Sequence, residues 1–172
     1  MKRTFPQQAI GATNTPQPVF STTLTANLAA SPTPQSIAVA SSVGFKVRDK
    51  VSLGPGTATF EQADIVAIVD GTHITVIVTK AHTSGDFVGL NFPLANLYVQ
   101  TKDGNSASLY VGNSPLMTDA LWCISQLTKV AAAAQPVDFY DAQIYGANPG
   151  NLNEYWVYGT MGDKYTVSLS YC

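Results

Sequence analysis

Apolar and polar residues alternate along much of the chain from Ser21 to Leu90, and a period of two is typical of β-strands. Short strands are predicted at Ser36–Ala40, Lys50–Leu53, Asp64–Val69 and His73–Val78. In the last of these, Ile74, Val76 and Val78 share one face, which we expect to face the core. Ile77 lies on the opposite face, as either a scattered exposed apolar residue or part of a subunit contact.

Two Asp-Gly turns separate predicted strands. Asp70-Gly71 lies between two β-branched runs, and both residues tolerate positive φ, so the pattern predicts a hairpin. Asp103-Gly104-Asn105 predicts a second hairpin, between Leu97–Thr101 and Ser108–Gly112. Gly54-Pro55-Gly56 predicts a plain turn, because it lacks the following helix and the Lys-Ser/Thr pair of a phosphate-binding loop.

The last third of the chain carries runs of β-branched and aromatic residues separated by Gly, Pro or Asn. These runs predict strands at Ala120–Lys129, Val137–Tyr145, Glu154–Gly159 and Tyr165–Tyr171. A helix competes over Leu121–Ala134, because Ala131–Ala134 has high helix propensity, but we predict mainly a strand buried on both faces. Six strands in about 80 residues are typical of a β-sandwich or jelly roll.

The first 20 residues predict an extended N-terminal arm, because Pro6, Pro16 and Pro18 interrupt regular structure. Apolar residues of the arm could anchor it on a neighbouring subunit; they are Phe5, Ile10, Val19 and Phe20. The predicted fold is therefore all-β. It has an arm at residues 1–20, a small β-barrel-like module at 21–90 and an antiparallel β-sandwich or jelly roll at 91–172.

Charge argues against several classes of partner. Only 12% of the residues are charged, against about 25% in an average globular protein. The 9 Lys and Arg residues balance 11 Asp and Glu residues, so the basic surface of a nucleic-acid-binding protein is not expected. No apolar run approaches the roughly 18 residues of a membrane helix, and the N-terminus lacks the apolar core of a secretory signal.

Residues with catalytic or metal-binding chemistry are few. No nucleophile motif accompanies His82, which we expect to hold a loop in place, and His73 is expected to be solvated. Cys123 and Cys172 lack metal-ligand spacing, and a disulfide between them stays open. We therefore expect no catalytic residue, no metal and no cofactor.

Aromatic residues crowd into the last third of the chain, where Tyr155, Trp156 and Tyr158 follow one another closely. Alternation puts Tyr155 on one strand face and the other two on the opposite face. Such residues form a sandwich core, anchor a protein interface or stack on sugars. The candidate partner contacts are Phe5, Ile10, Phe20, Ile77, Tyr155, Trp156 and Tyr158.

Two motifs carry a family resemblance. Residues 43–54 read VGFKVRDKVSLG and residues 79–86 read TKAHTSGD. They resemble the small β-modules of bacteriophage virion proteins, in which a GF-VGD-VSLG strand and loop precede a hairpin ending near TKAH-SGD. The resemblance covers residues 21–90. One departure is Arg48-Asp49, where Gly-Asp is the usual pair.

A second resemblance covers Leu97-Tyr98-Val99 and residues 156–167, which are similar to hairpins of phage capsid-decoration and fibre domains. Together the two imply a non-enzymatic virion protein, assembled in the host cytoplasm. Its implied role is a head-decoration (cement) protein that binds the major capsid protein as a homo-oligomer, a trimer in this reading. The alternatives are a head-fibre subunit, a fibre subunit bound to neck or portal-adaptor proteins, and a virion-displayed carbohydrate-binding module.

Overall fold

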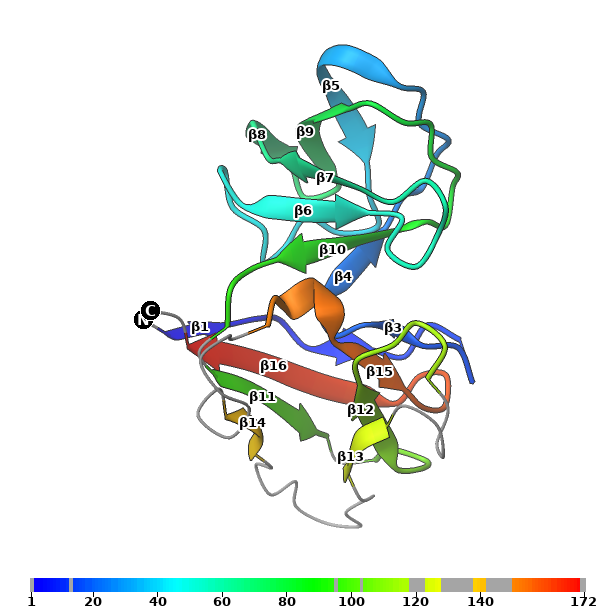
Figure 1. Ribbon diagram of the computed structural model, residues 1–172, viewed down its shortest axis with the longest axis vertical. Helices are drawn as coiled ribbons and strands as arrows, with labels where there is room; N and C mark the ends of the chain where they lie inside the picture. The colour runs from blue at the N-terminus through cyan, green and yellow to red at the C-terminus, as the bar shows by residue number, and fades with distance from the viewer. Residues whose placement is uncertain are drawn as a thin grey trace. The chain divides into compact units, whose positions relative to one another are not determined.

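The computed structural model describes residues 2–12, 14–94, 96–102, 104–117, 123–127, 138–141 and 150–170. The chain divides into two compact units, shown in Figure 1. Unit 1 comprises Met1–Val19 and Pro93–Cys172, and unit 2 comprises Phe20–Phe92. Within the described ranges the regular structure is β-strand apart from a 3-10 helix, η1, at Leu152–Glu154. The predicted all-β fold class is confirmed.

Unit 2 contains two antiparallel sheets. Its strands are β4 (Ser21–Thr23), β5 (Ser31–Ala38), β6 (Lys50–Leu53), β7 (Glu61–Asp64), β8 (Ala67–Asp70), β9 (His73–Val78) and β10 (Phe87–Asn91). One sheet has the order β4-β10-β6-β7 and the other the order β5-β9-β8. The edge strands β4 and β5 are joined just past their ends by an antiparallel bridge between Leu24 and Val39, with hydrogen bonds from the Thr25 N–H to Ala38 (3.0 Å) and from the Ala40 N–H to Thr23 (2.9 Å). The described sheets of the expected barrel-like module do not close into a barrel.

The β8–β9 hairpin is confirmed, with Ile68 opposite Ile74 in antiparallel register. The alternation predicted for β9 also holds, because Ile74, Val76 and Val78 are fully buried while Ile77 is exposed. Strand β5 starts earlier than predicted and contains Pro32 and Pro34. Its register against β9 shifts between Ser31 and Gln35, since proline has no N–H for the ladder.

Unit 1 also contains two antiparallel sheets. Its strands are β1 (Lys2–Thr4), β2 (Gln8–Ala9), β3 (Gln17–Pro18), β11 (Asn96–Thr101), β12 (Leu109–Gly112), β13 (Cys123–Leu127), β14 (Asp138–Asp141), β15 (Trp156–Tyr158) and β16 (Lys164–Ser170). The first sheet has the order β1-β16-β11-β14, and β2 also pairs with β16. The second has the order β13-β12-β15-β3. This arrangement is consistent with the predicted sandwich.

The hairpin predicted around residues 103–105 is wrong, because β11 and β12 belong to different sheets. Strand β11 pairs with β14 and β16, whereas β12 pairs with β13 and β15. The connecting residues are held instead by the turn before β16. Asn105 exchanges two hydrogen bonds with the Lys164 backbone (2.7 and 2.9 Å), and the buried Asp163 carboxylate accepts from the Ser106 N–H (2.6 Å).

The predicted N-terminal arm is part of unit 1. Strands β1 and β2 pair with β16, and β3 pairs with β15 (Figure 1). The Gln17 amide donates to the hydroxyl of the buried Tyr165 (2.9 Å), and Ile10 is buried. The prolines limit the length of the strands rather than preventing them: Pro6 lies between β1 and β2, and Pro18 lies in the edge strand β3, where a missing N–H is tolerated.

Several predictions fall on residues outside the described part. Of the strands expected at Ala120–Lys129 and Val137–Tyr145, only 123–127 and 138–141 are described, and both are strands. The remainder of the alternative helix, the side chain of Cys123 and the whole of Cys172 lie outside the described residues.

Replacing Ile10 tests whether the N-terminal segment belongs to the core of unit 1. We expect Ile10→Ala to lower the free energy of unfolding by about 3 kcal/mol, because it removes buried methyl and methylene groups and leaves a cavity. Denaturant unfolding followed by tryptophan fluorescence measures the change. Met161→Ala is the control, since Met161 is exposed, and it should cost under about 0.5 kcal/mol. Equal stability of the two variants would contradict the placement.

Candidate functional site

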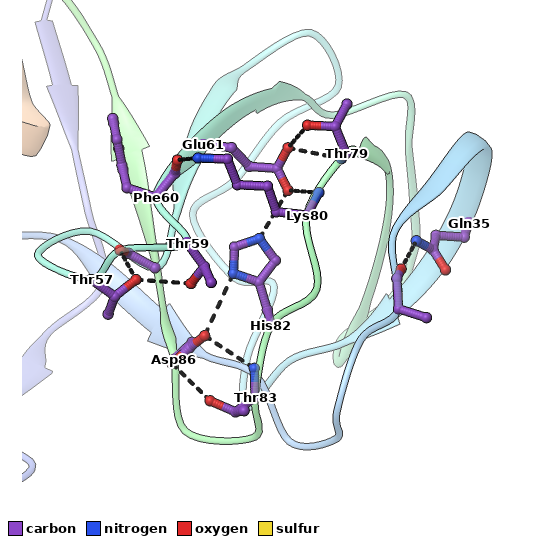
Figure 2. Close-up of polar contacts among 12 residues, drawn as sticks. Gln35, Thr57, Thr59, Phe60, Glu61, Thr79, Lys80, His82, Thr83 and Asp86 are labelled. Atoms are coloured by element: carbon purple, nitrogen blue, oxygen red, sulfur yellow. Dashed lines mark hydrogen bonds and ion pairs between the residues drawn. The ribbon is translucent and has the colours of Figure 1, made fainter.

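His82 lies between two carboxylates in unit 2, as Figure 2 shows. Its side chain has no exposed surface. The ring atom Nε2 lies 2.9 Å from Oε1 of Glu61, and Nδ1 lies 3.5 Å from Oδ2 of Asp86. We call Glu61, His82 and Asp86 the histidine cluster. It gathers three ionisable groups from two segments, the start of β7 and the loop between β9 and β10.

Backbone hydrogen bonds place each member of the cluster. Glu61 is the first residue of β7, opposite Leu53 of β6. His82 exchanges two backbone hydrogen bonds of 2.9 Å with Leu28. Asp86 closes the turn before β10, where its carboxylate accepts from the N–H and the hydroxyl of Thr83, both at 3.1 Å. The cluster therefore joins the start of β7 to the loop between β9 and β10.

The Glu61 carboxylate accepts several hydrogen bonds besides that from His82. Thr79 donates its N–H (2.8 Å) and its hydroxyl (2.6 Å), and Lys80 donates its N–H (3.0 Å). Desolvation by itself would raise the pKa of Glu61. The hydrogen bonds from Thr79, His82 and Lys80 outweigh it and lower this pKa from 4.5 to about 2. Glu61 is thus held as an anion.

Close packing surrounds the other side of the ring. A Cβ on Gly54, whose φ is +58°, would lie 2.7 Å from the Thr57 hydroxyl oxygen and 3.3 Å from Nδ1 of His82. Thr57 donates to the Gly54 carbonyl oxygen (2.7 Å) and shares a hydrogen bond with Thr59 (2.9 Å). His82 Nδ1 has no hydrogen-bond partner within the described chain, since 3.5 Å to Asp86 is too long for one.

This geometry favours a structural role for the histidine cluster. The imidazole is enclosed, and both carboxylates accept hydrogen bonds from backbone N–H groups of the loop that carries His82. Lys80 adds a further tie, because its ammonium donates to the Phe60 carbonyl oxygen at 2.7 Å (Figure 2). The arrangement is what we expected of His82, a ring that holds a loop in place.

Two further features are absent from the residues that the structure describes. These residues contain no group of three or more His, Cys, Asp or Glu side chains placed to hold a metal ion. They also form no helix long and apolar enough to cross a membrane.

Most of the predicted contact residues are core residues, which corrects their assignment as partner contacts. Phe5 and Ile10 are buried in unit 1, as are Tyr155 and Trp156. Phe20 is buried in unit 2, where its ring centroid lies 5.2 Å from that of Phe45. Large apolar side chains on short strands are needed to fill two small cores, so few are left for contacts.

Two predicted contact residues remain on the surface. Ile77 is 41% exposed on β9. Tyr158 is partly exposed and lies opposite Tyr110 on the neighbouring strand, with ring centroids 6.0 Å apart in an edge-to-face arrangement. A carbohydrate platform built on Trp156 is not supported, because that side chain is buried.

An apolar surface that the sequence reasoning missed lies on unit 2. Val43, Val47, Val66 and Val69, which we call the valine face, are between 48% and 59% exposed. They lie on two segments that run side by side. At one end Ile65 and the 48–49 backbone exchange two hydrogen bonds of 2.8 Å, and at the other Ser42 donates its N–H to the Gly71 carbonyl oxygen (2.9 Å).

A signal for this surface was present in the sequence. Residues 65–69 are continuously apolar, and a strand in a small module cannot turn every one of them toward the core. The alternation predicts a single strand from Asp64 to Val69, and this prediction is wrong. In the structure β7 ends at Asp64 and β8 begins at Ala67, in a different sheet, so the alternation is interrupted at Val66.

Comparison with protein-family models, with curated proteins and with solved structures found no match for this chain. Functional proposals therefore rest on the residues themselves.

Glu61→Gln tests the histidine cluster. The glutamine side chain has no negative charge, and its NH₂ group cannot accept hydrogen bonds from the Thr79 and Lys80 N–H groups. We therefore expect the free energy of unfolding of unit 2 to fall by about 2 kcal/mol, because solvent partly screens these interactions. Asp64→Asn, at the other end of β7, is the control. Asp64 forms an exposed ion pair with Lys50 (3.1 Å), so its loss should cost under about 1 kcal/mol. Thermal unfolding followed by circular dichroism compares the two.

A comparison of the wild type with Glu61→Gln at different pH values tests the protonation of Glu61. Since folding lowers its pKa, Glu61 contributes its full stability above pH 4.5 and loses it as the pH falls from 4.5 to about 2. The stability difference between wild type and Glu61→Gln should shrink through this window. Asp70, whose pKa the Thr72 N–H and His73 lower to about 2, titrates in both proteins and cancels from the difference. A pH-independent difference would show that Glu61 is not stabilised as the anion.

Proposed function

We propose that this protein is a non-enzymatic virion structural protein that decorates a bacteriophage head by binding its shell of major capsid protein. The valine face carries the proposal. An exposed group of apolar side chains on adjacent, hydrogen-bonded segments is typical of a protein-binding surface, because leaving it in water promotes aggregation. This surface lies in the part of the chain that resembles virion β-modules.

The histidine cluster and the low charge are consistent with this role. A binding protein needs loops of fixed shape, and the cluster fixes the loop from Thr79 to Asp86. A chain in which 12% of the residues are charged presents a mainly uncharged polar surface, which packs against neighbouring subunits with little desolvation cost.

Decoration would act through binding linkage. A protein that binds the assembled shell and not the dissociated subunits stabilises the shell in proportion to RT ln(1 + [L]/Kd). A contact of modest affinity becomes effective when it is repeated over the whole head, because each bound copy adds its own contribution.

Heat resistance and copy number test the proposal. Heads that lack this protein should release DNA at a lower temperature than complete heads, and adding the purified protein back should restore the difference. Quantitative mass spectrometry should find about one copy per capsid subunit, or a simple fraction of one. Equal heat resistance, or only about a dozen copies per particle, would refute decoration and favour a neck or tail location.

A further inference from the structure

We propose that Nδ1 of His82 and Oδ2 of Asp86 bind a divalent transition-metal ion, for which Zn²⁺ is the probe, and that Glu61 is a positioning residue for the histidine. The site lies within unit 2 and is independent of the partner that the protein binds. It gives a ligand to Nδ1, the buried ring atom that has no hydrogen-bond partner within the described chain.

The contact with Glu61 sets which nitrogen of the His82 ring carries the proton. Nε2 lies 2.9 Å from Oε1 of Glu61, a carboxylate held as an anion, so Nε2 donates the proton of this contact. In the neutral ring Nδ1 then has a lone pair and no proton. Histidines that bind metal ions share this arrangement, in which one ring nitrogen donates to a carboxylate and the other binds the ion. Glu61 therefore prepares Nδ1 as a ligand.

The side-chain atoms near Nδ1 are also hydrogen-bond acceptors. Oδ2 of Asp86 lies 3.5 Å from Nδ1 (Figure 2), and a carboxylate has no proton to donate. The Thr57 hydroxyl donates to the Gly54 carbonyl oxygen, so the Thr59 hydroxyl donates to Thr57 and keeps only lone pairs for another partner. Thr59 Oγ1 and His82 Nδ1 each lie 3.3 Å from the position that a Cβ on Gly54 would take. Acceptors that face one another without a donor favour a cation between them.

The separation of the two ligand atoms suits a shared metal ion better than a hydrogen bond. Nitrogen and oxygen ligands lie about 2.1 Å from a tetrahedral Zn²⁺ ion, which puts them about 3.4 Å from one another. The 3.5 Å between Nδ1 of His82 and Oδ2 of Asp86 is close to that spacing and is too long for a hydrogen bond. Imidazole and carboxylate are common ligands of Zn²⁺, whereas Mg²⁺ and Ca²⁺ prefer oxygen ligands alone.

Two side-chain ligands make a weaker site than the three or four of a structural zinc centre, and the described residues hold no such larger group. The two ligands are already fixed in place. His82 exchanges backbone hydrogen bonds with Leu28, and the Asp86 carboxylate accepts two hydrogen bonds from Thr83. Little conformational entropy is therefore lost on binding. The Asp86 side chain is 15% exposed, so water can reach the ion and fill its remaining coordination positions.

Calorimetric titration of the EDTA-treated protein with Zn²⁺ measures the affinity of the site. Asp86→Asn removes the charged ligand but keeps an oxygen that can accept from Thr83, so it should bind Zn²⁺ at least about tenfold more weakly than wild type. Glu61→Gln should weaken binding roughly tenfold to hundredfold. His73→Gln is the matched control, because His73 also contacts an aspartate, Asp70 (3.0 Å), but at the exposed surface, and it should bind as wild type does.

NMR of the ¹⁵N-labelled histidine rings locates the ion in the full chain and does not depend on the folding of any variant. Zn²⁺ should shift the Nδ1 resonance of His82 and leave His73 unchanged, and Mg²⁺ should shift neither. In metal-free Glu61→Gln the same spectra should show part of the ring proton moved from Nε2 to Nδ1, which a purely structural role of Glu61 would not cause.

Three results would overturn the metal site. They are a wild-type protein that does not bind Zn²⁺, equal affinity of wild type and Asp86→Asn, and a Zn²⁺-induced shift confined to His73. The last two would mean an adventitious ion only. None of the three bears on decoration, because neither measurement contains phage heads.

Discussion

The Glu61 carboxylate and the buried His82 ring fix the start of β7, and the rest of unit 2 depends on that position. Glu61 accepts hydrogen bonds from two consecutive backbone N–H groups, at Thr79 and Lys80, which fixes the end of β9 relative to β7. Strand β7 then pairs with β6 through to Asp64, and Ile65 continues the pairing with Asp49. The valine face begins at the next residue. A polar cluster at the start of β7 thus sets the register of the apolar surface that begins after its end.

Sequence reasoning identified the strands whose side chains alternate cleanly. Strands β6 and β9 were predicted with their observed bounds, because each has a regular apolar face and a glycine or aspartate turn beside it. Pairing was harder to predict. The turn at residues 103–105 has hairpin composition, yet Asn105 contacts Lys164, almost 60 residues later. Local sequence cannot show that a distant strand competes for the same hydrogen bonds.

Five of the seven predicted contact residues are buried for a related reason. Aromatic and large aliphatic residues mark protein interfaces, but they also fill cores, and composition does not separate the two uses. Phe5 and Ile10 lie among prolines and polar residues, which favoured a solvent-exposed arm. Their burial depends on β16, which pairs with β11 along one edge and with β1 and β2 along the other. By contrast a loop-holding role was expected for His82 because no nucleophile motif accompanies it, although the residues that enclose it, Glu61 and Leu28, are distant in the sequence.

The course of the chain through its two units has a consequence for how the protein is made. Unit 2 is continuous, from Phe20 to Phe92, whereas unit 1 combines residues 1–19 with residues 93–172. During synthesis unit 2 can therefore fold as soon as it leaves the ribosome. The N-terminal strands must wait for β16, which pairs with β1, β2 and β11 and is the last of the described strands to be translated. Until then Phe5 and Ile10 lack the strand beside which they are buried in the folded unit.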